Sequence, residues 1–210
     1  MTGQLDNRIY RLEPVFRDDF RGTANWRMEG EGARLWADDG WLYCDSRAGD
    51  VHAATIWCAA AEMADPVWIE FDVRFLDGMF NGNLILHARG TDGRDVLESS
   101  GRRKGNYDEY HVFPNYILTL LNDGQAVRIR YRRNPGFALL GETFYRPALE
   151  LNRTYRVVVI LRAGRVQVRV DGVNRFEGAD PSPLTAGRFA LRTWKTYLGW
   201  SNLGVYRIAG

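Results

Sequence analysis

Residues 67–78 read VWIEFDVRFLDG, and apolar side chains recur there at every second position. In an extended strand, successive side chains point to opposite faces of the sheet. The apolar side chains would therefore share one face: Val67, Ile69, Phe71, Val73 and Phe75. Trp68 and the charged side chains would share the other: Glu70, Asp72 and Arg74. The stretch is predicted to be a strand with one face on a core and one on solvent.

The same period of two continues outward along the chain. Further strands are predicted at 81–90, 128–133, 156–162, 165–172, 187–194 and 203–210, with Gly-containing turns between several of them. The best helical candidate is short, at 54–64. Short strands punctuated by turns predict an all-β fold, a two-sheet antiparallel β-sandwich of the jelly-roll type, as a single domain over 1–210. An early strand near Phe16–Phe20 is predicted to pair with the closing strand near Val205–Ile208, which would bring the termini together.

The composition of the chain argues against several classes of function. The 210-residue chain carries 28 Lys+Arg against 26 Asp+Glu, a net charge of +2, which does not indicate a nucleic-acid partner. No stretch reaches the roughly 20 apolar residues of a membrane helix. The start has no apolar run of a signal peptide, so a cytoplasmic location is expected. Cys44 and Cys58 lie outside any Cys/His cluster, so free thiols are expected and zinc is not.

Residues 102–122, RRKGNYDEYHVFPNYILTLLN, hold the densest group of reactive side chains. As a strand, this segment would place Tyr107, Glu109 and His111 on one face and Tyr110 on the other. Phenol, carboxylate and imidazole are groups that transfer protons in enzymes. The candidate catalytic residues are therefore Tyr107, Glu109, Tyr110 and His111. The alternative is a solvated, twisted strand with one hydrogen-bonded histidine.

Two further groups suggest ligand binding. Arginines at 128–133 can hold a carboxylate through paired N–H groups, or they can form a solvated sheet edge. The aromatic rings of 194–202 can stack on sugars, or they can belong to the core. The candidate substrate-binding residues are Arg103, Asn115, Arg128, Arg130, Trp194, Lys195 and Trp200.

Carboxylates elsewhere give weaker signals. Glu70 and Asp72 resemble the start of the Glu-x-Asp-x-x-Glu strand of sandwich glucanases, but Phe75 replaces the final Glu. This break counts against a two-carboxylate mechanism on that strand. Asp18 and Asp19 are candidates for a structural calcium ion. No catalytic metal and no other cofactor are expected.

Four segments carry a family resemblance: 25–32 (NWRMEGEG), 102–111 (RRKGNYDEYH), 130–137 (RYRRNPGF) and 198–208 (LGWSNLGVYRI). They resemble the DUF1961 family of the concanavalin A-like lectin/glucanase superfamily. The motif Gly-x-Tyr-x-Glu-Tyr-His is matched from Gly105 to His111. The resemblance implies a two-sheet jelly roll that covers nearly the whole chain, and a role in breaking down plant polysaccharides, particularly pectin-type rhamnogalacturonan. It implies no particular reaction.

The functional hypotheses are an enzyme, a binding module and an assembly protein. The first would cleave oligosaccharides, among them uronate-containing ones. In hydrolysis, Glu109 would be the acid with Asp108 or Glu98 as the second carboxylate. In β-elimination, arginine would bind the uronate, and Tyr110 or His111 would move protons. The alternatives are a non-catalytic carbohydrate-binding module and a homodimer formed through a flat sheet.

The candidate residues are predicted to meet on the concave face of one sheet. Tyr107, Glu109 and His111 should converge there with at least one of three arginines: Arg103, Arg128 and Arg130. Trp194 or Trp200 would form a wall beside them. Glu109→Gln and His111→Ala should then leave folding nearly intact and abolish sugar turnover or binding.

Overall fold

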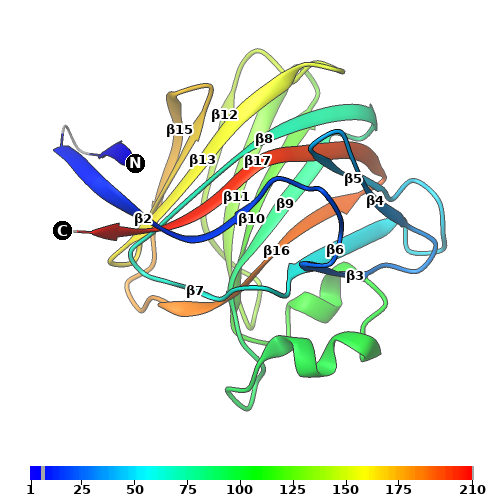
Figure 1. Ribbon diagram of the computed structural model, residues 1–210, viewed down its shortest axis with the longest axis horizontal. Coiled ribbons are helices and arrows are strands. Elements are labelled where there is room, and N and C mark those ends of the chain that lie inside the picture. Colours follow the sequence, from blue (N-terminus) through cyan, green and yellow to red (C-terminus); the bar gives the residue numbers. More distant parts are fainter. Residues whose placement is uncertain (6–7, 210) are drawn as a thin grey trace.

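The computed structural model describes residues 1–5 and 8–209, which form two antiparallel sheets packed face to face (Figure 1). Sheet A contains β1 (Thr2–Leu5), β2 (Arg8–Asp18), β4 (Arg34–Asp38), β5 (Trp41–Asp45), β8 (Val67–Gly78), β13 (Thr154–Arg162), β14 (Arg165–Val170), β15 (Val173–Ala179) and β17 (Thr196–Ala209). Sheet B contains β3 (Trp26–Glu29), β6 (Ala53–Cys58), β9 (Asn81–Ala88), β10 (Asn115–Asp123), β11 (Ala126–Asn134), β12 (Ala138–Tyr145) and β16 (Ala186–Trp194), and the short β7 (Met63–Ala64) pairs with β16. The all-β sandwich predicted from the sequence is confirmed.

The strand order departs from the sequence order in both sheets. Sheet A runs β1-β2-β17-β8-β13-β14-β15, with β4 and β5 joined to β17. Sheet B runs β12-β11-β10-β9-β16-β6-β3. The helix considered at 54–64 is wrong, because these residues form β6 and β7 instead. Every residue of β6 is buried, and a fully buried strand lacks the alternation that separates it from a helix in sequence.

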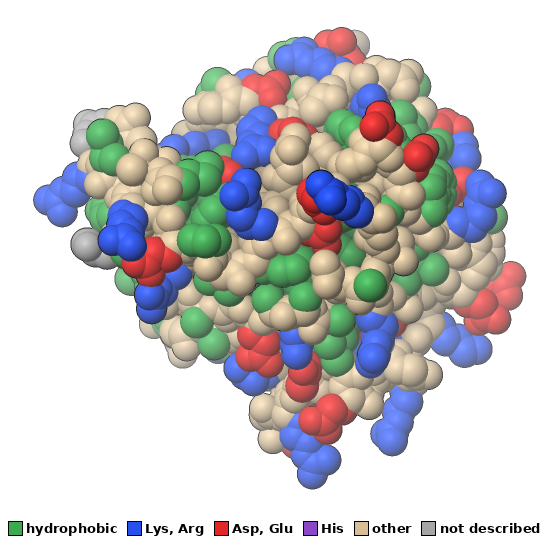
Figure 2. Space-filling model, viewed as in Figure 1, with side chains coloured by type: hydrophobic (Ala, Val, Ile, Leu, Met, Phe, Trp, Pro, Cys, Tyr) green, Lys and Arg blue, Asp and Glu red, His purple; other side chains and the backbone are tan. Residues whose placement is uncertain are grey.

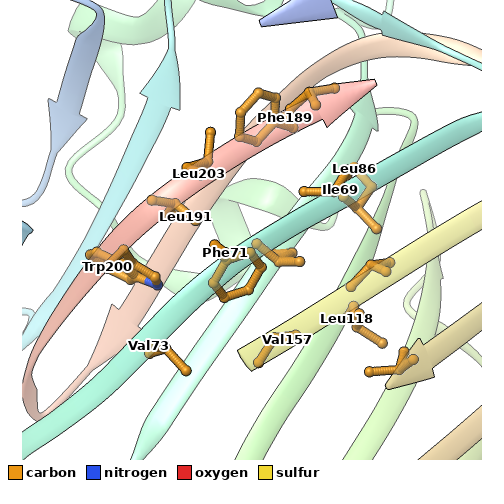
Figure 3. Close-up of a cluster of buried hydrophobic side chains, with 14 of the residues drawn as sticks. Ile69, Phe71, Val73, Leu86, Leu118, Val157, Phe189, Leu191, Trp200 and Leu203 are labelled. Carbon is orange, nitrogen blue, oxygen red and sulfur yellow. The ribbon is translucent and has the colours of Figure 1, made fainter. Parts of the chain in front are cut away.

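The core lies between the two sheets. Figure 3 shows Ile69, Phe71 and Val73 of β8 packed with Leu118 of β10 and Trp200 of β17. The alternation predicted for 67–78 is confirmed, since Ile69 is fully buried in this core while Glu70 and Asp72 point to the outer face of sheet A. No helix in the described part of the chain is long and apolar enough to cross a membrane.

The first and last long strands are neighbours. β2 pairs with β17 from Arg11↔Ala209 to Asp18↔Leu203, and Val205 lies opposite Phe16. The pairing predicted between the early strand and the closing strand is confirmed. Figure 1 shows both ends of the chain on the same side of the molecule.

The connection between β9 and β10 contains two 3-10 helices, η1 (Val96–Arg102) and η2 (Tyr107–Tyr110). In Figure 1 they lie outside sheet B, next to β6, β3 and β16. Tyr110 and Phe113 pack with Trp57 and Ile85 in a second apolar cluster on that face. The 90–114 connection therefore covers one end of the outer face of sheet B and leaves the remainder to other side chains.

Candidate functional site

A row of polar residues crosses the outer face of sheet B. The strand register places them side by side, in the order Glu142, Arg130, Thr119, Asn83, Arg192, Thr55 and Glu29. Their chain neighbours Leu118, Leu84 and Leu191 point into the core. Alternation along each strand therefore turns the whole row away from the core.

One end of this row fixes the η1–η2 segment to the sheet. The carboxylate of Glu29 accepts hydrogen bonds from Arg103 Nη2 at 2.6 Å, Arg103 Nε at 2.9 Å and the Tyr110 hydroxyl at 2.7 Å. The Glu29 side chain is 1% exposed and that of Arg103 is 9% exposed. A buried, fully paired carboxylate of this kind tolerates loss of a partner poorly.

Arg103 and Tyr110 therefore have structural positions. Burial and the adjacent Glu29 carboxylate raise the pKa of Tyr110 far above its usual range, so its hydroxyl remains a proton donor to Glu29. Tyr110 is fully buried, which corrects the expectation that it would move protons. Arg103 lines a cavity within the 90–114 connection, apart from Tyr107 and His111, so it does not join the predicted group. The bidentate geometry that suits arginine to a uronate serves Glu29 here instead.

Glu109 also differs from the prediction, because residues 107–110 form a 3-10 turn rather than a strand. Its carboxylate accepts the backbone N–H groups of Lys104 at 3.0 Å, Gly105 at 2.9 Å and Asn106 at 2.8 Å. Asn106 is the N-cap residue of the turn and Glu109 is its third residue, so their contact is one half of a capping box, and the other two N–H groups lie just before the cap. Glu109 thus stabilises the turn and does not share a face with Tyr107 and His111.

Tyr107 and His111 are brought together on the outer face. Their ring centroids are 4.6 Å apart, and His111 stacks on Phe137 at 3.8 Å. The guanidinium of Arg192 lies 4.7 Å from the centroid of the Tyr107 ring. Burial lowers the pKa of His111, and Asp108 only partly opposes this, so the imidazole is neutral at neutral pH. It can therefore accept a proton.

Two arginines beside Tyr107 lack a carboxylate partner. In the described part of the chain, no carboxylate lies within ion-pair distance of Arg130 or Arg192, whereas Arg128 pairs with Asp123 at 3.0 Å. The nearest acidic charges acting on them are Glu142, opposite Arg130 on β12, and Glu109 near Arg192. Burial lowers the pKa of the Arg130 guanidinium, and the nearby Arg128 lowers it further. Arg192 is 2% exposed, donates one hydrogen bond to the Gly105 carbonyl at 3.0 Å and keeps a buried Nε without a partner. Unpaired buried cations are costly and mark candidate anion sites.

The remaining predicted binding residues divide between the outer face and the interior. Trp194 follows Arg192 by two positions on β16 and shares its face, with Lys195 Nζ 4.8 Å from its ring centroid. Asn115 is fully buried and donates to the carbonyls of Tyr110 and Phe113, so it shapes the loop. Trp200 is 2% exposed in the core, which corrects its assignment to a stacking wall (Figure 3).

Of the residues predicted to converge, Tyr107 and His111 lie together with Arg130 nearby, whereas Glu109 and Arg103 are bound to other groups and Arg128 pairs with Asp123. Sequence reasoning missed Arg192, Asn83, Thr119 and Phe137. The alternation along 187–194 shows that Arg192 and Leu191 face opposite ways. The alternation does not show which strands flank β16. Arg192 lies beside Asn83 because β16 pairs with β9 in one particular register.

The carboxylates considered for metal binding are already occupied. Asp18 accepts hydrogen bonds from the Phe20 backbone N–H at 2.8 Å and Trp26 Nε1 at 2.8 Å, and Asp19 pairs with Arg21 at 2.8 Å. Within residues 1–5 and 8–209, no group of three or more His, Cys, Asp or Glu side chains is arranged to hold a metal ion. A calcium ion at Asp18 and Asp19 stays a prediction.

Comparisons with known proteins agree on the fold. A family model described as "Domain of unknown function (DUF6250)" matches residues 49–203. The model is not that of DUF1961, so the family resemblance inferred from the motifs is not supported at the level of the family. No curated protein sequence matches the chain.

Several solved structures share the architecture. A protein of unknown function with a galectin-like fold from Bacillus subtilis is 22% identical with a TM-score of 0.81, and the match covers 95% of this chain and 99% of that one. An endo-β-1,3-glucanase from Pyrococcus furiosus is 11% identical with a TM-score of 0.66, over 100% and 98% of the two chains. The carbohydrate-binding module CBM66 from Bacillus subtilis is 15% identical with a TM-score of 0.60, over 87% and 95%.

Proposed function

This chain belongs to the DUF6250 family, and from that starting point we propose that it is a carbohydrate-active protein that binds a uronate-containing oligosaccharide on the outer face of sheet B. We propose further that it cleaves this ligand by β-elimination. The family description names no activity, so the proposal rests on the side chains of this chain. The polymer class suggested by the sequence resemblance, pectin-type rhamnogalacturonan, contains uronates and suits such a site.

The observation that carries the proposal is the pair of guanidinium groups of Arg130 and Arg192, which have no carboxylate partner in the described part of the chain. Arg130 is half-exposed and can meet a ligand directly, whereas Arg192 lies beneath the Tyr107 ring. A uronate carboxylate would supply the missing negative charge. The half-exposed Trp194 ring on the same face offers a surface on which a sugar ring can stack.

The chemistry follows from the groups near this cation. With the carboxylate bound to Arg130, the proton on the adjacent carbon (C5) becomes more acidic. A base removes that proton, the C4–O bond breaks, a C4=C5 double bond forms, and the departing oxygen takes a proton. We assign neutral His111 as the base and the Tyr107 phenol as the acid. His111 Nε2 is buried and has no hydrogen-bond partner among the described residues, so its lone pair is not already engaged. No water is consumed.

Hydrolysis has less support from the same groups. A two-carboxylate mechanism needs an acid and a second carboxylate on either side of the glycosidic bond. Glu109 is bound to three backbone N–H groups, and Glu29 is bound to Arg103 and Tyr110. Neither is available to protonate a leaving group. The glucanase and the binding module among the structural neighbours support a carbohydrate ligand without selecting a reaction.

The test uses rhamnogalacturonan and polygalacturonate oligosaccharides with the full chain and with Arg130→Gln. Elimination gives a new ultraviolet absorbance from the double bond conjugated to the carboxylate, together with new reducing ends. We expect Arg130→Gln to lower the rate by roughly 100-fold, as for loss of one charge-stabilising donor in an active site. Arg165→Gln, at the exposed start of β14 in sheet A, is the matched control and should leave the rate unchanged.

The outcomes separate the alternatives. New reducing ends without the absorbance would show hydrolysis and overturn the elimination step. Binding that depends on Arg130 without any turnover would instead favour a non-catalytic binding module. If Arg130→Gln and the control bind and cleave acidic oligosaccharides equally well, Arg130 is not part of the ligand site.

A further inference from the structure

The outer face of sheet A carries a cavity that the proposed function does not use. Its volume is about 720 Å³, and it lies between the start of the chain, the end of β2 and the strands β8, β13 and β17. Glu70, Arg156, Asn202 and Tyr206 are among its lining residues. The volume is within the range of pockets that hold small ligands. This cavity is on the opposite side of the sandwich from Arg130.

The polar side chains of the cavity are fixed in one network. Arg156 forms ion pairs with Glu70 at 3.0 Å and Asp72 at 3.1 Å. Asn202 Nδ2 donates to Asp72 at 2.7 Å, and Trp68 Nε1 donates to Glu70 at 3.0 Å. Glu70 is 6% exposed. Side chains held in this way are preorganised, so a ligand that binds them orders few new rotamers.

Tyr206 lines the cavity, and two further aromatic rings lie beside it on the same face of sheet A. Trp41 lies opposite Ser201 on β17, and Ser201 lies opposite Asp72 on β8. Trp41 and Tyr43 are half-exposed and nearly parallel, and the guanidinium of Arg74 lies 4.4 Å from the Trp41 ring centroid. Figure 2 shows hydrophobic side chains between charged ones over β4, β5 and the adjoining part of β17. Fixed hydrogen-bonding groups beside aromatic rings are suited to sugar rings, which have both hydroxyl groups and apolar faces.

The charges around the cavity favour an uncharged ligand over an acidic one. Asp18, Asp19 and Glu70 line it together with Arg17 and Arg156, and Asp72 lies directly behind. Arg156 is already neutralised by two carboxylates. Because carboxylates outnumber arginines around the cavity, a uronate would bind less readily here than at Arg130 on sheet B. Carboxylates and an amide can accept and donate hydrogen bonds to the hydroxyl groups of an uncharged sugar.

We propose that this cavity is a second carbohydrate site, which binds an uncharged sugar residue next to Trp41. It does not depend on the reaction proposed for sheet B. The two faces would then hold two kinds of sugar, acidic on sheet B and neutral on sheet A. A branched or alternating polymer with both kinds would engage both faces.

The test removes one side chain without disturbing the backbone. Asn202 has a φ of 49°, a conformation that glycine adopts freely, so Asn202→Gly should fold normally. The matched control is Asn152→Gly, at a φ of 61° in an exposed turn. The probes are L-rhamnose, D-galactose and neutral galacto-oligosaccharides, measured by titration calorimetry and by ligand-observed NMR. Thermal unfolding of each variant checks that the fold is retained.

We expect the wild type, Asn152→Gly and Arg130→Gln to bind at least one neutral probe, and Asn202→Gly to bind it roughly tenfold more weakly. Neutral-sugar binding that falls in Arg130→Gln and survives in Asn202→Gly would place the ligand on sheet B and overturn the proposal. No binding of any neutral probe would also overturn it. If the acidic oligosaccharides fail to react, the proposed reaction on sheet B is wrong. That result does not affect the test of the sheet A cavity, which uses neutral sugars only.

Discussion

Whether an arginine of this chain can bind an anion depends on whether a carboxylate lies next to it. Arg103, Arg128 and Arg130 are equivalent in sequence as carboxylate-binding candidates. In the structure, Arg103 is bound to Glu29, Arg128 pairs with Asp123, and Arg130 pairs with no carboxylate in the described part of the chain. Glu29 lies more than seventy positions from Arg103. Local sequence therefore names the arginines that can bind an anion, and only tertiary contacts show which one remains available.

His87 provides a residue-scale prediction about pH. Its side chain is fully buried, Nδ1 lies 2.8 Å from the Leu184 carbonyl oxygen, and burial lowers its pKa to about 4. The unfolded chain binds a proton below pH 6.5 and the folded chain does not until about pH 4. The free energy of unfolding should therefore fall as pH falls through this window, by up to about 3 kcal/mol from His87.

The measurement compares wild type with His87→Asn by urea unfolding from pH 7 to pH 4. Asparagine tolerates the positive φ of 51° at this position. Asp65 Oδ1 lies 3.9 Å from His87 Nε2, and burial raises the pKa of Asp65 to about 6, which acts in the opposite sense. The difference between the two proteins isolates the histidine. Parallel pH curves would contradict the prediction.

At the scale of elements, segment 102–122 shows where sequence periodicity succeeds and where it fails. Residues 115–123 form β10, in line with the strand considered for this segment, while residues 107–110 form a 3-10 turn. The turn arises because Glu109 satisfies three backbone N–H groups, an interaction that competes with extended structure. A pattern of alternating side chains carries no information about such a backbone contact. The orientation of Glu109 could therefore not be predicted from the segment alone.

Glu109→Gln tests this reading of the turn. A neutral amide is a weaker acceptor, so we expect the turn to be destabilised by about 1 kcal/mol. Hydrogen exchange at the amides of Gly105 and Asn106 should accelerate, while turnover of an acidic oligosaccharide should fall only slightly. Asp108→Asn, the exposed neighbour, should leave this amide exchange unchanged. Abolished turnover with unchanged amide exchange would instead assign Glu109 to the chemistry, as the sequence pattern proposes.

At the scale of the whole molecule, the fold could be predicted because both sheets contribute alternating apolar side chains to one core. The face assigned to Ile69, Phe71 and Val73 from sequence is the face that packs in Figure 3. Apart from the pairing of the early strand with the closing strand, strand neighbours could not be predicted, since no local pattern encodes that β17 also pairs with β8. The site row on sheet B depends on such neighbours, which is why its members were only partly identified.

A shared core predicts that the two sheets unfold together. Leu118 is 4% exposed and lines a small cavity of about 30 Å³ with Phe71 and Trp200. Leu118→Ala should lower the free energy of unfolding by about 2–5 kcal/mol. Tryptophan fluorescence and far-ultraviolet circular dichroism should report the same shifted midpoint. The control is Leu139→Ala, because Leu139 is 50% exposed. Its free energy of unfolding should stay within about 0.5 kcal/mol of that of the wild type. Separate midpoints for the two probes would show that the sheets are independent units.

The adjacency of β2 and β17 gives the molecule an almost circular connectivity. A short linker between the ends would close the chain into a ring, and new termini could then be opened at an exposed hairpin such as Ala163–Gly164 without crossing either ligand face. For the same reason, the sandwich could be inserted into a surface loop of another protein, with both ends entering at one place. Its two outer faces would remain on opposite sides of the graft, so a single insertion could display two recognition surfaces at once.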